Sequence, residues 1–322
     1  MRTRMLFWFL AITMAGFDVA SGADPLITLE GHQNVVSVIR FAAEGNRLIS
    51  GSWDKTVRFW NLSVEEKSTA SEVQEDWVLD LRISGDQREI LAASQRRLNR
   101  LSMVQWDVID RGVELGGASV NSVALSRSAE LLAVGGRDGF ATLWKIGESA
   151  PRLRLSGFES WVSQVVITPD DKTLVTGTRT GWIRLFDTAK GRPLNAWQAH
   201  PDRQVMELSV HPEGGILLSS GYEQTAVIRR LDDGEVLAKL TGHRGIVTAS
   251  AWSKSGSILA TGERHGSIHL WKTSDWSLIR KFAAHPDKQL GFSVTSLEFS
   301  PDEKQIASGS VDRTIKLWRV DP

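Results

Sequence analysis

The feature that most limits the possible folds is an eleven-residue pattern that occurs three times, at residues 50–60, 261–271 and 308–318. The three copies read SGSWDKTVRFW, TGERHGSIHLW and SGSVDRTIKLW. In each copy, small residues lead into a polar turn, and β-branched and aromatic residues follow as in a half-buried β-strand. Three copies in one chain indicate a repeated two-strand unit.

Weaker copies extend the repeat along the chain. With the last residue of the pattern aligned, the units end at Trp60, Trp106, Trp144, Phe186, Arg230, Trp271 and Trp318. Successive spacings are 46, 38, 42, 44, 41 and 47 residues, near the ~40 to 45 residues of a four-stranded propeller blade. Each unit also has a short turn rich in Pro, Gly, Asp or Ser between two apolar runs, where a hairpin must reverse. The sequence therefore predicts an all-β chain of seven four-stranded antiparallel units with almost no helix.

The first 22 residues differ from the rest. Arg2 and Arg4 precede an apolar run at residues 5–17, and small residues follow at 20–23. This pattern predicts a secretory signal peptide over residues 1–22. The alternative is a retained membrane anchor, but the thirteen residues of the run fall short of the ~20 that span a bilayer. We therefore expect a secreted or periplasmic, bacterial protein with no membrane span after cleavage.

Composition excludes several classes of function. The chain has 38 basic and 38 acidic residues and no cysteine. The balanced charge argues against a nucleic-acid partner, and the missing cysteines exclude disulfides, thiolate metal sites and a cysteine nucleophile. His265 and His269 lie on a turn and a strand, where their spacing does not make the paired ligands that it would make on a helix. We expect no metal, no cofactor and no catalytic residue.

The repeat resembles the Trp-Asp repeat family of seven-bladed β-propellers over residues 25–322. In that family a His, a Ser or Thr, an Asp and a Trp of one blade form a buried hydrogen-bonded tetrad. The resemblance implies two complete structural tetrads, which are His32, Ser50, Asp54 and Trp60, and His285, Ser308, Asp312 and Trp318.

The other five units keep fewer of these residues. By the same alignment, the survivors and replacements are His243, Thr261, His265 and Trp271 in unit six; Val134, Asp138 and Trp144 in unit three; His200, Ser220, Gln224 and Arg230 in unit five; Thr176, Thr180 and Phe186 in unit four; and Trp106 in unit two. A buried indole or imidazole without a partner costs about 1–3 kcal/mol. These units must therefore satisfy the surviving side chains in another way.

The two ends of the chain complement each other. Only four residues follow Trp318, too few for an outer strand, whereas residues 25–30 form an apolar strand that belongs to no earlier unit. We expect this N-terminal strand to complete the last blade and close the ring, which removes exposed sheet edges.

The resemblance implies a non-catalytic, monomeric scaffold that binds a protein or peptide through the top face of the propeller. The position before the tetrad Asp and the start of the innermost strand are the interaction positions in the family. Carried over by position, the candidate partner-binding residues are Trp53, Arg137, Arg179, Arg264, Trp77 and Trp161, with Glu223 and Val311 also at the first position. Trp and Arg are enriched in binding hot spots. For Trp77 and Trp161, packing between blades is an equal alternative. The alternative function is a propeller enzyme or small-molecule binder that uses the central channel.

Overall fold

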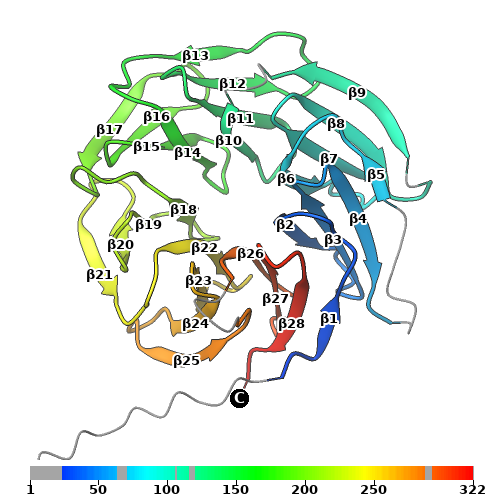
Figure 1. The fold of residues 1–322 in the computed structure, drawn as a ribbon. Coiled ribbons are helices and arrows are strands. Elements are labelled where there is room, and N and C mark those ends of the chain that lie inside the picture. The colour runs from blue at the N-terminus through cyan, green and yellow to red at the C-terminus, as the bar shows by residue number, and fades with distance from the viewer. Residues whose placement is uncertain (1–23, 64–70, 106, 116–119, 287–291, 322) are drawn as a thin grey trace, which may run out of the picture.

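The computed structural model describes residues 24–63, 71–105, 107–115, 120–286 and 292–321, and these residues form strands and no helix. Seven four-stranded antiparallel sheets stand around a central axis as the blades of a β-propeller (Figure 1). The predicted all-β, seven-bladed fold is confirmed. The predicted signal peptide at residues 1–22 lies outside the described residues, among which no helix is long and apolar enough to cross a membrane.

The strands follow one another from the axis outward in each blade. Blades one to four contain β2 (Val36–Phe41), β3 (Arg47–Ser52), β4 (Thr56–Asn61) and β5 (Ser71–Val73); β6 (Val78–Ile83), β7 (Glu89–Ser94), β8 (Arg97–Ser102) and β9 (Val108–Glu114); β10 (Val120–Leu125), β11 (Leu131–Gly136), β12 (Ala141–Lys145) and β13 (Leu153–Leu155); and β14 (Val162–Ile167), β15 (Thr173–Thr178), β16 (Trp182–Asp187) and β17 (Pro193–Gln198). Blades five to seven contain β18 (Glu207–Val210), β19 (Ile216–Ser220), β20 (Ala226–Arg230) and β21 (Val236–Leu240); β22 (Val247–Trp252), β23 (Ile258–Glu263), β24 (Ser267–Lys272) and β25 (Leu278–Ala283); and β26 (Val294–Phe299), β27 (Gln305–Ser310), β28 (Ile315–Arg319) and β1 (Ile27–Leu29).

The ring is closed by β1. This strand pairs antiparallel with β28, with Ile27 opposite Leu317 and Leu29 opposite Ile315. Figure 1 shows the two ends of the described chain side by side in this blade. The first strand of the described residues therefore serves as the outer strand of the last blade, as the sequence predicted.

The hydrophobic core lies between neighbouring blades. At the closing seam, Leu29, Ile315 and Leu317 of blade seven pack in one buried cluster with Leu48 and Trp60 of blade one. Blades approach closely because the second strand often carries glycine: a Cβ at Gly309 would lie 2.8 Å from a methyl group of Val36.

Hydrogen bonds near the axis also join the blades. Ser37 Oγ donates to Val78 O at 2.6 Å between blades one and two, and Thr295 Oγ1 donates to Val36 O at 2.5 Å across the seam. The seam is thus held by the same kind of contact as an internal blade boundary.

Strand registers correct two of the predicted unit ends. Trp60 pairs with Leu48, and the residues that pair in the same way are Leu101 in blade two and Arg229 in blade five. Arg230 lies one residue too far, and Trp106 lies outside the described residues, four positions beyond the end of β8. The structural unit ends are Trp60, Leu101, Trp144, Phe186, Arg229, Trp271 and Trp318, with more even spacings of 41, 43, 42, 43, 42 and 47 residues. The sequence alignment was displaced in blades two and five because neither blade has an aromatic residue at the Trp position.

Candidate functional site

We define the top face as the end of the ring that carries the turns between the second and third strands, such as residues 53–55, and the loops that enter the innermost strands. Polar side chains just beneath this face hold the turns in place. The candidate binding residues lie on this face.

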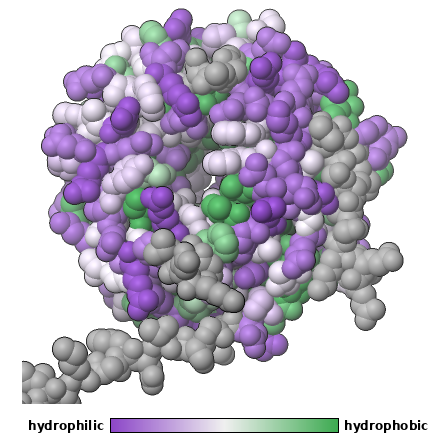
Figure 2. Space-filling model, viewed as in Figure 1, coloured by the Kyte–Doolittle hydropathy of each residue, from purple (hydrophilic) through white to green (hydrophobic). Residues whose placement is uncertain are grey.

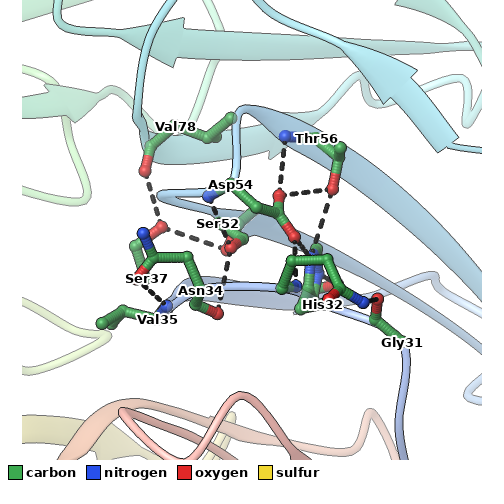
Figure 3. A network of polar contacts seen from close by, with 12 residues as sticks. Gly31, His32, Asn34, Val35, Ser37, Ser52, Asp54, Thr56 and Val78 are labelled. Carbon is green, nitrogen blue, oxygen red and sulfur yellow. Dashed lines mark hydrogen bonds and ion pairs between the residues drawn. The ribbon is translucent and has the colours of Figure 1, made fainter.

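In blade one, His32, Ser50, Asp54 and Trp60 form one hydrogen-bonded tetrad, of which Figure 3 labels His32 and Asp54. Trp60 Nε1 donates to Ser50 Oγ at 2.8 Å, His32 Nε2 lies 2.7 Å from the same oxygen, and His32 Nδ1 lies 2.8 Å from Asp54 Oδ2. A carboxylate only accepts, so His32 Nδ1 donates to Asp54, and a singly protonated ring then accepts from the Ser50 hydroxyl at Nε2, while the indole N–H donates to Ser50 Oγ. Asp54 also accepts from the backbone N–H and the hydroxyl of Thr56, which fixes the turn that presents Trp53.

Blade seven repeats this geometry. His285 Nδ1 lies 2.8 Å from Asp312 Oδ2, His285 Nε2 lies 2.8 Å from Ser308 Oγ, and Trp318 Nε1 donates to Ser308 Oγ at 2.9 Å. Burial by itself would raise the pKa of Asp312, but hydrogen bonds from His285 and Thr314 outweigh it and lower the pKa to about 2. The same balance holds the pKa of Asp54 well below its usual range.

Blade six keeps half of the hydrogen-bonded tetrad. Trp271 Nε1 donates to Thr261 Oγ1 at 2.8 Å, and His243 Nε2 lies 2.8 Å from that oxygen. Because His265 stands where the acid belongs, His243 Nδ1 has no partner among the described residues. Its ring contacts the buried ring of His269 at a centroid distance of 4.3 Å. Burial lowers the pKa of His243 to about 4 and that of His269 to about 2.

Blade three supplies another partner for its tetrad Trp, and blade four replaces the Trp by an apolar side chain. Trp144 Nε1 donates to Thr142 Oγ1 at 2.9 Å, a threonine that pairs with Val134 across the sheet. In blade four Phe186 takes the Trp position and packs against Phe158, with ring centroids 5.7 Å apart. Neither phenyl ring needs a hydrogen-bond partner.

The assignments in blade five were wrong by one residue. His200 bonds to Ser219 Oγ at 3.0 Å through Nε2 and to the carboxylate of Glu223 through Nδ1. Ser219 and Glu223 therefore occupy the Ser and Asp positions, not Ser220 and Gln224. Consequently Tyr222, not Glu223, stands before the acid on the top face, where it is 48% exposed.

Blade two has lost the tetrad. The buried Gln74 stands at the entry of β6, and its side-chain oxygen accepts a hydrogen bond from the amide of Asn99 on β8. Leu101 occupies the Trp position. Ala92 and Leu101 stand at the Ser and Trp positions, so the sequence pattern matched at Trp106 instead.

The structure brings the candidate binding residues together in three groups on the top face. Trp53 and Trp77 are half-buried and stack between blades one and two, with ring centroids 4.7 Å apart and planes 12° apart. Trp161 is 40% exposed and lies under two guanidinium groups, that of Arg179 at 4.7 Å and that of Arg137 at 5.7 Å from its ring centroid.

The third group is built around Tyr222, which sequence reasoning missed. Tyr222 and Arg264 line a hollow of about 350 Å³, and Tyr222 and Arg179 line a neighbouring one of about 670 Å³. Arg264 thus lies beside Tyr222 and not beside Trp53. A correct register in blade five would have revealed this position, because Tyr222 follows Gly221 as Trp53 follows Ser52.

No group of three or more His, Cys, Asp or Glu side chains that could hold a metal ion occurs among the described residues. The buried pair of His243 and His269 lies beside strand β25, on which Lys281 pairs with His269 across the sheet.

Comparison with known proteins gives a consistent result. A family model described as "WD domain, G-beta repeat" matches residues 23–61, 113–145, 149–187, 234–272 and 276–319. The unmatched stretches 62–112 and 188–233 contain the three inner strands of blades two and five, the blades in which a leucine and an arginine replace the Trp. The match covers more than half of the chain.

Similar proteins include the WD repeat domain-containing protein 83 homolog of Dictyostelium discoideum, which is 19% identical over 90% of this chain and 96% of its own length. Apoptotic protease-activating factor 1 of Rattus norvegicus is 23% identical over 90% of this chain, and striatin of Mus musculus is 23% identical over 94%. This chain spans 26% and 44% of those two proteins. All three relatives come from eukaryotes.

Proposed function

The chain belongs to the WD-repeat family, and on that premise we propose that it is a non-catalytic scaffold that binds a protein or peptide partner on its top face. The observation that carries the proposal is the display of aromatic rings and guanidinium groups on this face. Trp161 is flanked by Arg137 and Arg179, and Tyr222 lies between Arg179 and Arg264.

The chemistry of these groups favours a partner with acidic and apolar side chains. Guanidinium groups bind carboxylates in a bidentate manner, and large flat rings bury much area at little cost in conformational entropy. The stacked Trp53 and Trp77 are held against each other before any partner arrives. Little entropy is then lost when a partner covers them.

The test is capture of partners by immobilised protein, followed by measurement of the affinity for each captured protein. Truncation of a hot-spot residue costs about 2 kcal/mol or more, so Trp53→Ala with Arg179→Glu should weaken binding by at least about thirtyfold. The matched control is Leu237→Ala with Arg319→Glu, an exposed apolar residue and an exposed arginine away from the top face. If every captured partner binds the double variant as well as the wild type, the proposal is rejected.

We further propose that the scaffold acts as a monomer in a secreted or periplasmic setting, after removal of residues 1–22. The support is the charged, apolar and small-residue order of the N-terminal sequence. Mass spectrometry of the exported protein should find a mature N-terminus near residue 23. An exported sample that retains Met1 contradicts cleavage. Size-exclusion chromatography with light scattering tests the monomer.

A further inference from the structure

The central channel contains a cavity of about 460 Å³ that is lined by the innermost strands of all seven blades. Figure 1 shows these strands around the axis, and Figure 2 shows an opening at the centre of a largely hydrophilic face. The volume lies in the range of small-molecule sites. Because the seven innermost strands differ in sequence, the wall of the channel differs from one side to the other.

One side of the wall is an ion-pair network from blades seven, one and two. Arg40 Nη2 lies 2.6 Å from Asp80 Oδ1, and Arg40 Nη1 lies 3.6 Å from Glu298 Oε2. Asp80 also accepts from the backbone N–H groups of Leu81 and Leu125, at 2.8 and 3.0 Å. Arg40 and Asp80 are therefore well supplied with partners inside the protein.

Arg82, which lies beside this network on β6, has few partners inside the protein. Its Nη2 donates to Leu125 O at 3.2 Å, but its Nε is buried without a hydrogen-bond partner, and no carboxylate oxygen in the described part of the chain lies within 4.0 Å of the guanidinium. Burial and the nearby charge of Arg40 lower the pKa of Arg82, although the charges of Asp80 and Glu298 partly oppose this shift. The group stays charged, because an arginine does not lose its proton in proteins, and it keeps donors available to the cavity.

Glu207, on β18 of blade five, is the opposite case. Its carboxyl accepts one hydrogen bond, from Ser250 Oγ at 2.7 Å, and no cationic side chain of the described residues lies within 4.0 Å of it. Burial raises the pKa of Glu207 to about 8. An acid in this state ionises when a cation is brought to it.

Arg82 and Glu207 face the channel from opposite sides. Their strands, β6 and β18, lie across the central opening from each other in Figure 1. Small residues such as Ala124, Ser209 and Ala251 share the rest of the lining with larger ones, including Trp252 and the cationic residues Arg127 and Lys254. The cavity lies within this ring of residues.

We propose that the central channel binds a small zwitterion of the amino-acid or short-peptide class, with its ammonium group at Glu207 and its carboxylate at Arg82. A buried charge is retained at low cost only when it is paired and hydrogen-bonded. One ligand with both charges pairs both groups. A ligand with one charge pairs only one of them.

Binding of an ammonium group ionises Glu207, so a proton leaves the protein when the ligand binds at neutral pH. The affinity should then rise as the pH increases from 6 toward 8, while the amine of the ligand is still charged. Calorimetry in two buffers with different ionisation enthalpies measures the released proton directly. This readout does not depend on the absolute affinity.

The experiment uses the full chain and a series of ω-amino acids from glycine to 6-aminohexanoate, compared with alkylamines and alkanoates of the same lengths. We expect at least one ω-amino acid to bind, and the amine or carboxylate of matching length to bind at least tenfold more weakly. Glu207→Gln and Arg82→Gln should abolish binding. The controls are Glu213→Gln and Arg88→Gln, exposed residues of turns in the same two blades, which should bind as the wild type does.

Four results would overturn the proposal. Three of them are no binding by any ω-amino acid, equal binding of an alkylamine and its zwitterion, and undiminished binding by Glu207→Gln. A basic peptide that binds more tightly than the ω-amino acids and does not need Arg82 would also overturn it, because the channel would then receive a partner's side chain. Glu207→Gln preserves the shape of a carboxyl that is largely neutral at pH 7, so this variant decides the matter if Arg82→Gln fails to fold.

Discussion

Replacement of Leu29 by alanine tests whether β1 closes the ring. Leu29 is 1% exposed and lies in the buried cluster that contains Ile315 and Leu317 of blade seven and Leu48 and Trp60 of blade one. Its side chain therefore fills the seam between the first and last blades. Leu26, three residues earlier, is 43% exposed and serves as the matched control.

The expected loss follows from the burial. A fully buried leucine truncated to alanine loses about 3 kcal/mol, from the transfer of the side chain and the cavity left behind. With an unfolding entropy of about 2.1 cal/mol/K per residue, a domain of roughly 300 residues loses about 1.6 °C per kcal/mol. Leu29→Ala should thus lower the melting temperature by about 5 °C, and Leu26→Ala by less than about 1 °C.

The assay is thermal and urea unfolding followed by circular dichroism, with the deletion of residues 24–30 as a second arm. The deletion also removes the backbone pairing of Ile27–Leu29 with β28, so it should lower the melting temperature more than Leu29→Ala does. The closure argument is refuted if Leu29→Ala and Leu26→Ala melt within 1 °C of each other and the deletion melts like the wild type.

Three further predictions concern the blades. The pKa values of His243 and His269 lie below the ordinary 6.5, so the stability that these residues contribute is present above pH 6.5 and is lost as the pH falls, on the order of 2 kcal/mol per histidine by pH 5. Urea unfolding at pH 7 and at pH 5 should therefore show a smaller loss of stability for His269→Gln than for the wild type. An equal loss in the two proteins would contradict the assignment. Ser50→Ala leaves the indole N–H of Trp60 and the Nε2 atom of His32 without a partner, so it should cost about 2–4 kcal/mol. Thr142→Ala frees only the indole N–H of Trp144 and should cost about 1–2 kcal/mol. Denaturant titration of both variants checks this order, and the reverse order would count against it. Gly266→Ala places a Cβ 2.3 Å from a backbone carbonyl oxygen at a φ of 78°, so it should cost more than about 1 kcal/mol; an unchanged urea midpoint would disprove that strain.

Much of the fold follows from local chemistry. Thr314, Ile315, Leu317 and Trp318 carry the alternation of a half-buried strand, and the small residues before them make the turn. A pattern of this kind repeats with the length of a blade, so the number of blades and the closing strand could be predicted from the sequence. The register of blade five could not, because a slip of one residue in a strand exchanges its two faces and the blade has no Trp to anchor the alignment.

The sequence by itself determined the repeat, the seven blades, the strand at residues 25–30 that completes the last one, and the residue types available at each turn. Only the tertiary structure decided which of those residues meet. Trp53 stacks on Trp77 and Trp161 lies under Arg137 because neighbouring blades bring residues 24 positions apart to one edge, and Arg179 meets Trp161 within blade four. The same holds for Arg82 and Glu207, which lie more than a hundred residues apart. The physical reason is that hydrophobic periodicity is set within one strand, whereas the distance between two charges is set by the closure of the whole ring.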